Sequence, residues 1–431
     1  MQYRWLPWSI AALNLMVPPR AWSEAAPENK RESQRSVTLE WAVEKAFADS
    51  PQLLAASAQR EEARGRLVGA EIYPANPVLS ASAASRRGMG RSAKDLAVSL
   101  SQELAIGGRR GNRIDASRSE MEAASASLIW NKRLLVATVH VAFIDALRAR
   151  DLVLVAEQDL ALAKSLYELA EKGLAKGAAT RIDVNVAAAE LGRSEAAFEN
   201  ANGAFTSARA ILARTMGMNP RTRFKVAGTL RAALAAPSSL SNMLRDAQER
   251  RGDVAALRDQ QVASEARHEL ARSEAWPTVT LQAFAEREAD VDTILGGGLS
   301  IPLPLFDRNQ GAIAETRARL ARSRAELATG QLLASEQLVS AHARYLAAAT
   351  AVKQLRKRVV GNLEENLALL QRAFDAGKQT WPEVLIIRRT FVDAQRLLTN
   401  AEADARQAWV ALELASGQLP IPAESSERTK K

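Results

Sequence analysis

Hydrophobic residues recur every three or four positions through two long stretches of the chain. The first stretch carries this seam at Leu160, Ala163, Tyr167, Ala170 and Leu174. A sustained period of 3.5 residues predicts coiled-coil packing, and the alanines let two antiparallel helices approach closely. We therefore expect very long helices at about 110–175 and 180–216. A helix of about 65 residues would measure about 100 Å.

The same pattern returns about 200 residues later. The segment KGAATRIDV at 176–184 corresponds to AGKQTWPEV at 376–384, and a second seam occupies Val360, Leu363, Leu367, Leu370 and Phe374. The chain is thus expected to contain two copies of one unit, at 38–220 and 238–420. The second pair of long helices is expected at about 309–375 and 380–416. Each copy begins with a shorter helical region, the first near Thr38 and the second at about 239–273.

Four short segments alternate between apolar and polar residues, which is the two-residue period of a β-strand. They lie at about 78–84, 95–106, 278–286 and 293–303. In the second segment Leu96, Val98 and Leu100 share one face, whereas Asp95 lies on the other. The long helices are expected to bury their apolar stripes against each other, so no helix is left to cover the apolar faces of these strands. Membrane strands of about 9–11 residues fit this pattern, and a small solvated sheet capping a helical stalk is the alternative.

One chain offers too few strands to close a membrane barrel, which needs at least eight. Closure would therefore require association of several chains. The last strand runs into SIPLPLFDRNQGAIAETRARL at 300–320, where Pro302 and Pro304 stand between the strand and the next helix. Because a proline removes a donor from a central strand, we expect both prolines to lie outside the hydrogen-bonded ladder.

The N-terminal residues 1–23 have the features of a secretory signal peptide. Arg4 precedes the apolar stretch WLPWSIAALNLMV, and Ala21-Trp22-Ser23 resembles a cleavage site. A short buried helix is the alternative, which the prolines in this stretch disfavour. We expect export, a linker at 24–37 and a charged tail at 421–431. The chain has no cysteine, which excludes disulfides, thiolate metal sites and an N-terminal lipid anchor.

The charge pattern is typical of solvated helices. The net charge is +9, from 58 basic and 49 acidic residues. The two signs are interleaved, as in IAETRARLARSRAEL, so no nucleic-acid partner is expected. The histidines, His140, His268 and His342, are far apart and form no metal-ligand motif, and no phosphate-binding loop is present. We expect neither an enzyme nor a bound cofactor or metal.

The duplicated helix–strand–strand–helix–helix unit and the two Gly-x-x-Thr turns resemble those of the TolC-type outer-membrane factors. QELAIGGRRGNR and LSIPLPLFDRNQGAIAE are similar to the branch that serves heavy-metal (cobalt–zinc–cadmium type) resistance pumps. The resemblance implies a mainly α fold: a homotrimer with a 12-stranded β-barrel in outer-membrane lipid, continued by a long α-helical barrel through the periplasm. It also implies a periplasmic adaptor as partner and, indirectly, an inner-membrane pump of the RND type.

The resemblance further implies which residues act at the periplasmic end. The tips that dock the adaptor would be Ala175, Lys176, Gly177 and Thr180, together with Ala376, Gly377, Lys378 and Thr380. Glu383, and its counterpart Asp183 in the first copy, are candidates for an acidic ring at the pore constriction. The family's second acid, one turn further on, is replaced here by Ile386. Glycines at helix–helix turns are also ordinary C-caps, and acids favour helix N-termini, so structural roles remain alternatives.

Two other functions remain open. A periplasmic coiled-coil adaptor or structural protein would also be long and helical, although that class carries a single hairpin and larger β-domains. Within the resembled family, the cargo could be a drug or another small organic molecule in place of a metal cation.

Overall fold

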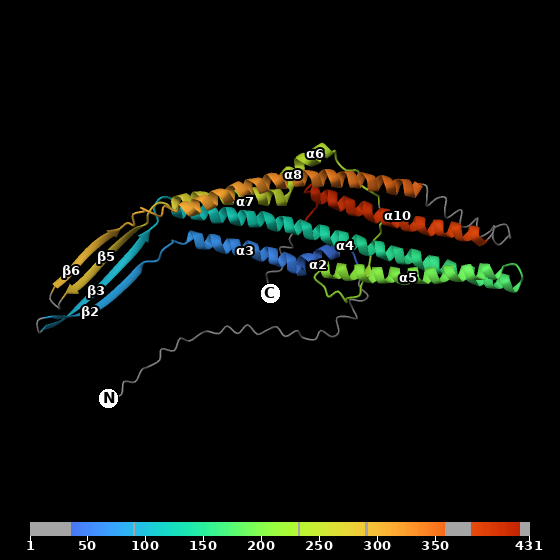
Figure 1. Cartoon of the computed structure of the whole chain (residues 1–431), viewed down its shortest axis with the longest axis horizontal. Helices are drawn as coiled ribbons and strands as arrows, with labels where there is room; N and C mark the ends of the chain where they lie inside the picture. The colour runs from blue at the N-terminus through green and yellow to red at the C-terminus, as the bar shows by residue number, and fades with distance from the viewer. Residues whose placement is uncertain (1–35, 89–90, 232, 289–291, 358–380, 423–431) are drawn as a thin grey trace, which may run out of the picture.

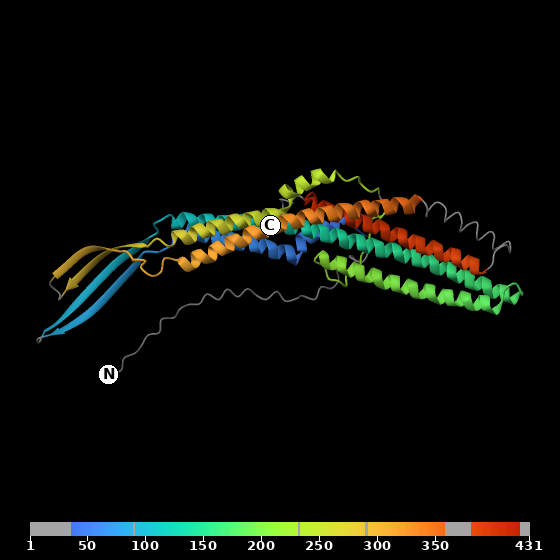
Figure 2. The ribbon, with the colours of Figure 1, turned by 45° about the horizontal axis from the view of Figure 1, so that its top comes forward.

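The computed structural model describes residues 36–88, 91–231, 233–288, 292–357 and 381–422. The molecule is elongated, with a β-sheet at one end and helices running away from it (Figure 1). Figure 2 shows α4, α5 and α10 side by side at the opposite end. Among the described residues no helix has both the length and the apolar character needed to cross a membrane.

The first copy of the repeated unit opens with two helices that meet at Ser50. Thr38 caps the first helix by accepting a hydrogen bond from the Trp41 backbone N–H at 3.3 Å, and Pro51 begins the second. The elements are α2 (Leu39–Asp49), α3 (Pro51–Glu71), β2 (Val78–Gly88), β3 (Arg91–Leu104), α4 (Arg109–Ala175) and α5 (Arg181–Thr215). In the predicted seam of α4, Ala163 and Ala170 are buried.

The second copy repeats this order. Its elements are α6 (Leu240–Arg250), α7 (Gly252–Ser273), β5 (Val279–Glu288), β6 (Asp292–Ser300), α8 (Gln310–Leu355) and α10 (Trp381–Ala415). The predicted seam at 360–374 lies outside the described residues.

Two glycines show the duplication in the backbone itself. Gly217 follows α5 with φ 73°, and Gly417 follows α10 with φ 72°. A Cβ on Gly217 would come within 2.5 Å of the Asp49 carbonyl oxygen, and one on Gly417 within 3.0 Å of the Arg250 carbonyl carbon. Each glycine therefore presses against the break between the first two helices of its own copy, a contact and a backbone conformation that favour glycine.

The sheet is antiparallel with strand order β2-β3-β5-β6. The register aligns Ala81, Val98 and Ala285, which places most apolar positions of the strands on one face, although Val78 and Ile294 lie on the other. This face is exposed in the single chain, and Leu295 reaches 78% exposure. The opposite face carries Ser, Thr, Asp and Glu side chains. Phe284 also lies on this polar face, where its ring covers Gly296.

Three strand boundaries differ from the sequence expectation by three residues or more. Strand β2 ends at Gly88 rather than 84, β3 begins at Arg91 rather than 95, and β6 ends at Ser300 rather than 303. The early end has a physical cause, since Pro302 and Pro304 cannot donate to a ladder. The chain then turns at Asn309, which has φ 58° and donates from its side chain to the Ala271 carbonyl at 2.8 Å. This bond fixes the start of α8 against the end of α7.

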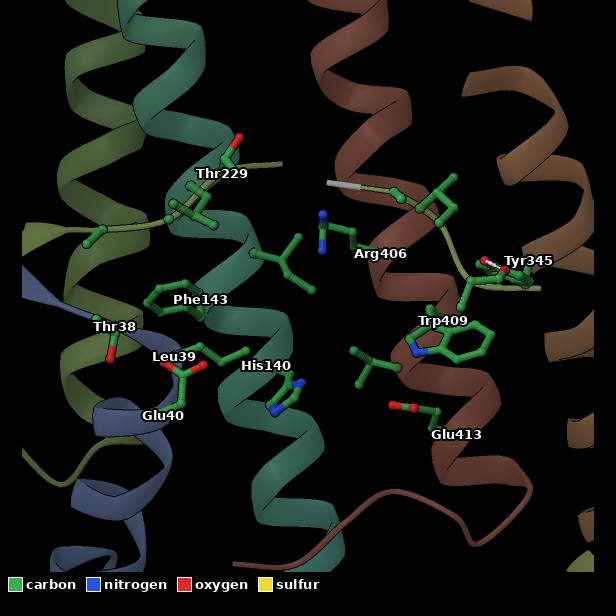
Figure 3. A pocket seen from close by; sticks show the side chains of 18 residues that line it. Thr38, Leu39, Glu40, His140, Phe143, Thr229, Tyr345, Arg406, Trp409 and Glu413 are labelled. Carbon is green, nitrogen blue, oxygen red and sulfur yellow. Dashed lines mark hydrogen bonds between the residues drawn. The ribbon is translucent and has the colours of Figure 1, made fainter. Parts of the chain in front are cut away.

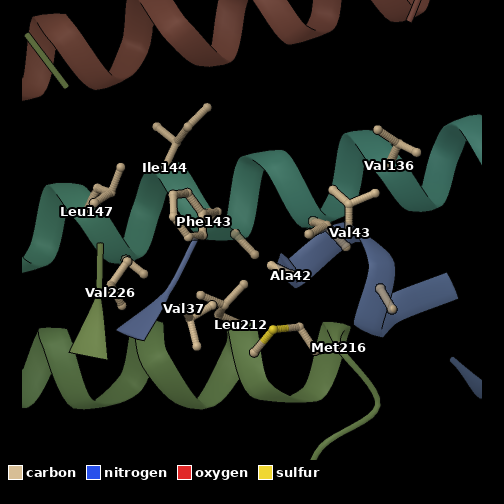
Figure 4. Packing of buried hydrophobic residues seen from close by; sticks show 14 of the residues in the cluster. Val37, Ala42, Val43, Val136, Phe143, Ile144, Leu147, Leu212, Met216 and Val226 are labelled. Carbon is tan, nitrogen blue, oxygen red and sulfur yellow. The ribbon is translucent and has the colours of Figure 1, made fainter. Parts of the chain in front are cut away.

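The main core lies halfway along the molecule, where α2 packs between α4 and α5 (Figure 4). Strand β1 (Ser36–Val37) pairs in parallel with β4 (Lys225–Val226) on the same core. These two-residue strands were not predicted, because they are too short to show any alternation.

Candidate functional site

The turn between α4 and α5 lies at the end of the molecule far from the sheet, and we call this end the hairpin end (residues 173–183 and 381–389). Helix α4 ends at Ala175, and the Lys176 N–H donates to the Gly173 carbonyl at 3.1 Å. Gly177 adopts φ 73°, and a Cβ added to it would meet no atom within 4 Å. Gly177 is thus required by backbone conformation, and the space beside it is open to a partner. Ala175, Lys176, Gly177 and Thr180 are all exposed.

Thr180 and Asp183 form a capping box at the start of α5. The Thr180 N–H donates to Asp183 Oδ2 at 2.8 Å, and the Asp183 N–H donates to Thr180 Oγ1 at 3.2 Å. The backbone and hydroxyl bonds from Thr180 hold the pKa of Asp183 below its usual value. Both residues therefore have a structural role at the helix start, as the alternative explanation anticipated.

The structure describes the second turn only from residue 381 onward. Ala376, Gly377, Lys378 and Thr380 lie outside the described residues. Glu383 is exposed in the first turn of α10, and Ile386 is exposed one turn later. The neighbouring Val384 and Leu385 are buried against Leu166 of α4. Glu383 and Ile386 therefore point away from this packed face.

A buried polar junction stands behind Glu383 and ties three helices together. Arg388 of α10 is only 3% exposed. It donates to Asp159 Oδ1 of α4 at 2.5 Å and to Ser194 Oγ of α5 at 2.6 Å. Ser194 in turn donates to Asp159 Oδ2 at 2.9 Å. Sequence reasoning missed this junction, because Asp159 and Arg388 are 229 residues apart.

Glu190 of α5 extends the junction toward the surface. It contacts Arg389 directly, and its Oε2 lies 3.8 Å from Arg388 Nη1. Burial alone would raise the pKa of Glu190. The Arg389 hydrogen bond and the charges of Arg389, Arg193 and Arg388 outweigh burial, so the pKa is lowered. The junction therefore favours the ionised form of Glu190 and holds α10 to both helices of the first hairpin.

A separate cavity of about 520 Å³ lies at mid-length between α4 and α10 (Figure 3). Phe143, Tyr345 and Trp409 line it together with His140 and Glu413. Burial lowers the pKa of His140, despite the opposing charge of Glu40. Burial also raises the pKa of Glu413, despite a hydrogen bond from Trp409. Within the described part of the chain no group of three or more metal-ligating side chains is positioned to hold an ion.

Comparison with known proteins gives a consistent result. The family described as Outer membrane efflux protein matches the chain twice, at residues 42–218 and 243–418. Protein CyaE of Bordetella pertussis is 27% identical over 426 residues, covering 93% of this chain and 88% of its own. The cobalt-zinc-cadmium resistance protein CzcC of Cupriavidus metallidurans is 26% identical over 371 residues, covering 86% of this chain and 87% of its own.

Among solved structures, the outer membrane protein VceC from Vibrio cholerae superposes with a TM-score of 0.72 at 21% identity, covering 88% of this chain and 96% of VceC. The fold is that of TolC-like outer-membrane channels, in which a helical barrel stands on a β-barrel base. The exposed sheet, the two hairpins and the double match agree, and they describe a transport component rather than an enzyme. The chain belongs to the outer membrane efflux protein family.

Proposed function

We propose that three copies of this chain form the outer-membrane channel of a tripartite efflux system that exports heavy-metal cations. The observation that carries the proposal is the sheet, whose apolar face is exposed and whose edges, β2 and β6, each pair on one side only within the described chain. Neither an open edge nor an isolated four-stranded sheet is stable in lipid. Three sheets joined edge to edge would close a barrel of 12 strands.

The metal cargo is supported by the similarity to CzcC, whose name assigns it to cobalt, zinc and cadmium resistance. The test is growth of a metal-sensitive strain that carries the cognate adaptor and pump, with and without this chain, on Co²⁺, Zn²⁺ and Cd²⁺. Restored metal resistance supports the proposal. Resistance to apolar drugs with no change for the metals would favour the other branch of the family.

The first tip is proposed to dock the periplasmic adaptor through its exposed turn, and the second tip at 376–380 is proposed to do the same. Ala178→Trp adds bulk without the strain that any side chain would suffer at Gly177, where φ is positive. We expect export to fall and assembly to remain intact. Gly65→Trp, on a helix where a Cβ also meets open space, is the matched control and should export normally.

Glu383 is proposed to give the periplasmic entrance a preference for cations. Three copies around a trimer axis would bring three carboxylates together, and rings of acidic side chains attract cations in other pores. Asp183 is the weaker candidate, because its oxygens already cap α5. Planar-bilayer recordings of Glu383→Gln should show reduced cation selectivity. Unchanged selectivity and conductance would leave Glu383 as a helix-start residue.

Export to the outer membrane through removal of residues 1–23 is part of the same proposal. N-terminal sequencing of protein recovered from the outer membrane should show a start shortly after Ser23. Recovery of the full chain from the cytoplasm would contradict it.

A further inference from the structure

The apolar face of the sheet ends where the strands approach the helices, and we call this end its inner limit. Tyr73 donates to the Glu103 carbonyl at 3.2 Å and accepts from the Ala105 N–H at 3.2 Å, which fixes its ring beside the end of β3. Trp276, next to the start of β5, is 62% exposed. Aromatic rings with a polar tip favour membrane–water boundaries. The inner limit of the apolar face therefore lies near Leu104.

Between this limit and the end of the sheet far from the helices, the side chains on this face are compatible with lipid. Its apolar members from all four strands are exposed: Leu79, Leu96, Val98, Leu100, Leu281, Leu295 and Leu299 are among them. The register also places Gln102 on this face, opposite Leu281. The Gln102 side-chain amide donates to the Ala75 carbonyl at 3.0 Å and to the Glu103 carbonyl at 2.8 Å. Its polar group is thus paired within the protein, as a lipid-facing position requires.

The outer limit follows from the length of the strand. Lys94 lies ten residues from Leu104 on β3 and on the same face. Ten residues at about 3.4 Å, tilted by about 45°, span about 24 Å along the membrane normal, and the apolar band of a membrane barrel is about 25 Å tall. Lys94 therefore falls at the far boundary of the band.

Basic residues stand on the apolar face at this boundary. Lys94 is exposed on the apolar face, and Arg287 is exposed on the same face of β5, opposite Leu96. The neighbouring acids Asp95, Glu286, Glu288 and Asp292 alternate onto the polar face, which would line the lumen. Lys94 and Arg287 therefore place basic groups on the lipid-facing side of the outer boundary.

We infer that Lys94 and Arg287 bind the phosphate groups of lipid headgroups in the outer leaflet. This rests on the proposed membrane orientation of the sheet. Cations near an anionic membrane surface attract phosphates with an energy that corresponds to about fivefold in affinity each, or about thirtyfold for the pair. The contact would fix the depth of the barrel in the membrane.

The test uses the mature channel in detergent, titrated with a diphosphorylated lipid A disaccharide and followed by native mass spectrometry. The double variant Lys94→Gln/Arg287→Gln should bind this glycolipid about thirtyfold more weakly than the wild type. The matched control Arg64→Gln/Arg118→Gln removes the same charge from exposed sites on α3 and α4 and should bind normally. The dephosphorylated disaccharide should bind the wild type and the double variant equally.

Three outcomes would overturn the inference. The double variant could bind the glycolipid as tightly as the wild type, the control pair could lose as much affinity, or inorganic phosphate at the same concentration could displace the glycolipid. Displacement would indicate a site for soluble anions in place of a lipid surface. Bilayer conductance of the double variant reports separately on channel formation, so failure of this inference is distinguishable from failure of the proposed function.

Discussion

Arg388 is predicted to be the side chain that most strongly fixes the second hairpin against the first. Its truncation in Arg388→Ala would leave the Asp159 carboxylate, which is only 10% exposed, with the Ser194 hydroxyl in place of a guanidinium. Removing one partner of a buried ion pair costs about 3–5 kcal/mol, because the remaining charge stays buried without compensation. The population of the locally opened state of α10 should therefore rise by a factor of about 100 to 4,000.

Hydrogen exchange of the amides at 384–398 in the assembled protein measures this opening. Arg193→Ala is the matched control, because Arg193 is an exposed member of the same cluster, 3.4 Å from Glu190, and an exposed pair contributes at most about 1 kcal/mol. The double variant Arg388→Met/Asp159→Asn removes both charges and should recover most of the lost protection. An increase of less than about tenfold in Arg388→Ala, or no recovery in the double variant, would show that the Arg388–Asp159 pair does not hold α10 in place.

Three further predictions concern other parts of the fold. Gly417→Ala should lower the free energy of unfolding by about 1–3 kcal/mol, because φ is 72° and a Cβ would meet the Arg250 backbone; thermal melts measure this. Gly65→Ala, where a Cβ meets open space, should be neutral or slightly stabilising. Phe284→Ala should loosen the pairing of β5 with β6 by uncovering Gly296, and the β6 amides should then exchange faster with solvent. Phe306→Ala, at a 91% exposed site, should leave the exchange of the β6 amides unchanged. Burial lowers the pKa of His140 in the folded state, so the folded protein loses stability as pH falls below the ordinary histidine pKa. Thermal melts at pH 7 and pH 5 should show a smaller loss of stability in His140→Gln than in the wild type. An identical loss in both proteins would contradict a role of His140 in the pH dependence.

The sequence predicted the elements whose signal is local and repeated. The 3.5-residue seam requires long helices, and α5 runs from Arg181 to Thr215 where about 180–216 was expected. The alternation in β3 sorted Leu96 and Asp95 onto opposite faces, as the register shows. Thr38 and Gly177 were placed at a helix start and a turn because capping chemistry is read from neighbouring residues.

The features that sequence missed depend on contacts between distant residues. Arg388 looks like one more charge on a charged helix until α4 and α5 bring Asp159 and Ser194 to it. Phe284 breaks the alternation of β5, and its reason appears only when β6 places Gly296 under the ring. The predicted end of the last strand at 303 was a different kind of error, because the sequence itself shows the prolines that end the ladder after Ser300.

This chain is expected to work only as a closed assembly of three copies. The direct test is the mass of the purified channel in detergent, measured for the same sample that is then recorded in a planar bilayer. We expect a single species of about three times the 46.7 kDa of the full chain, less the signal peptide if it is removed, and discrete conductance steps. A stable, monodisperse monomer that conducts ions would contradict it.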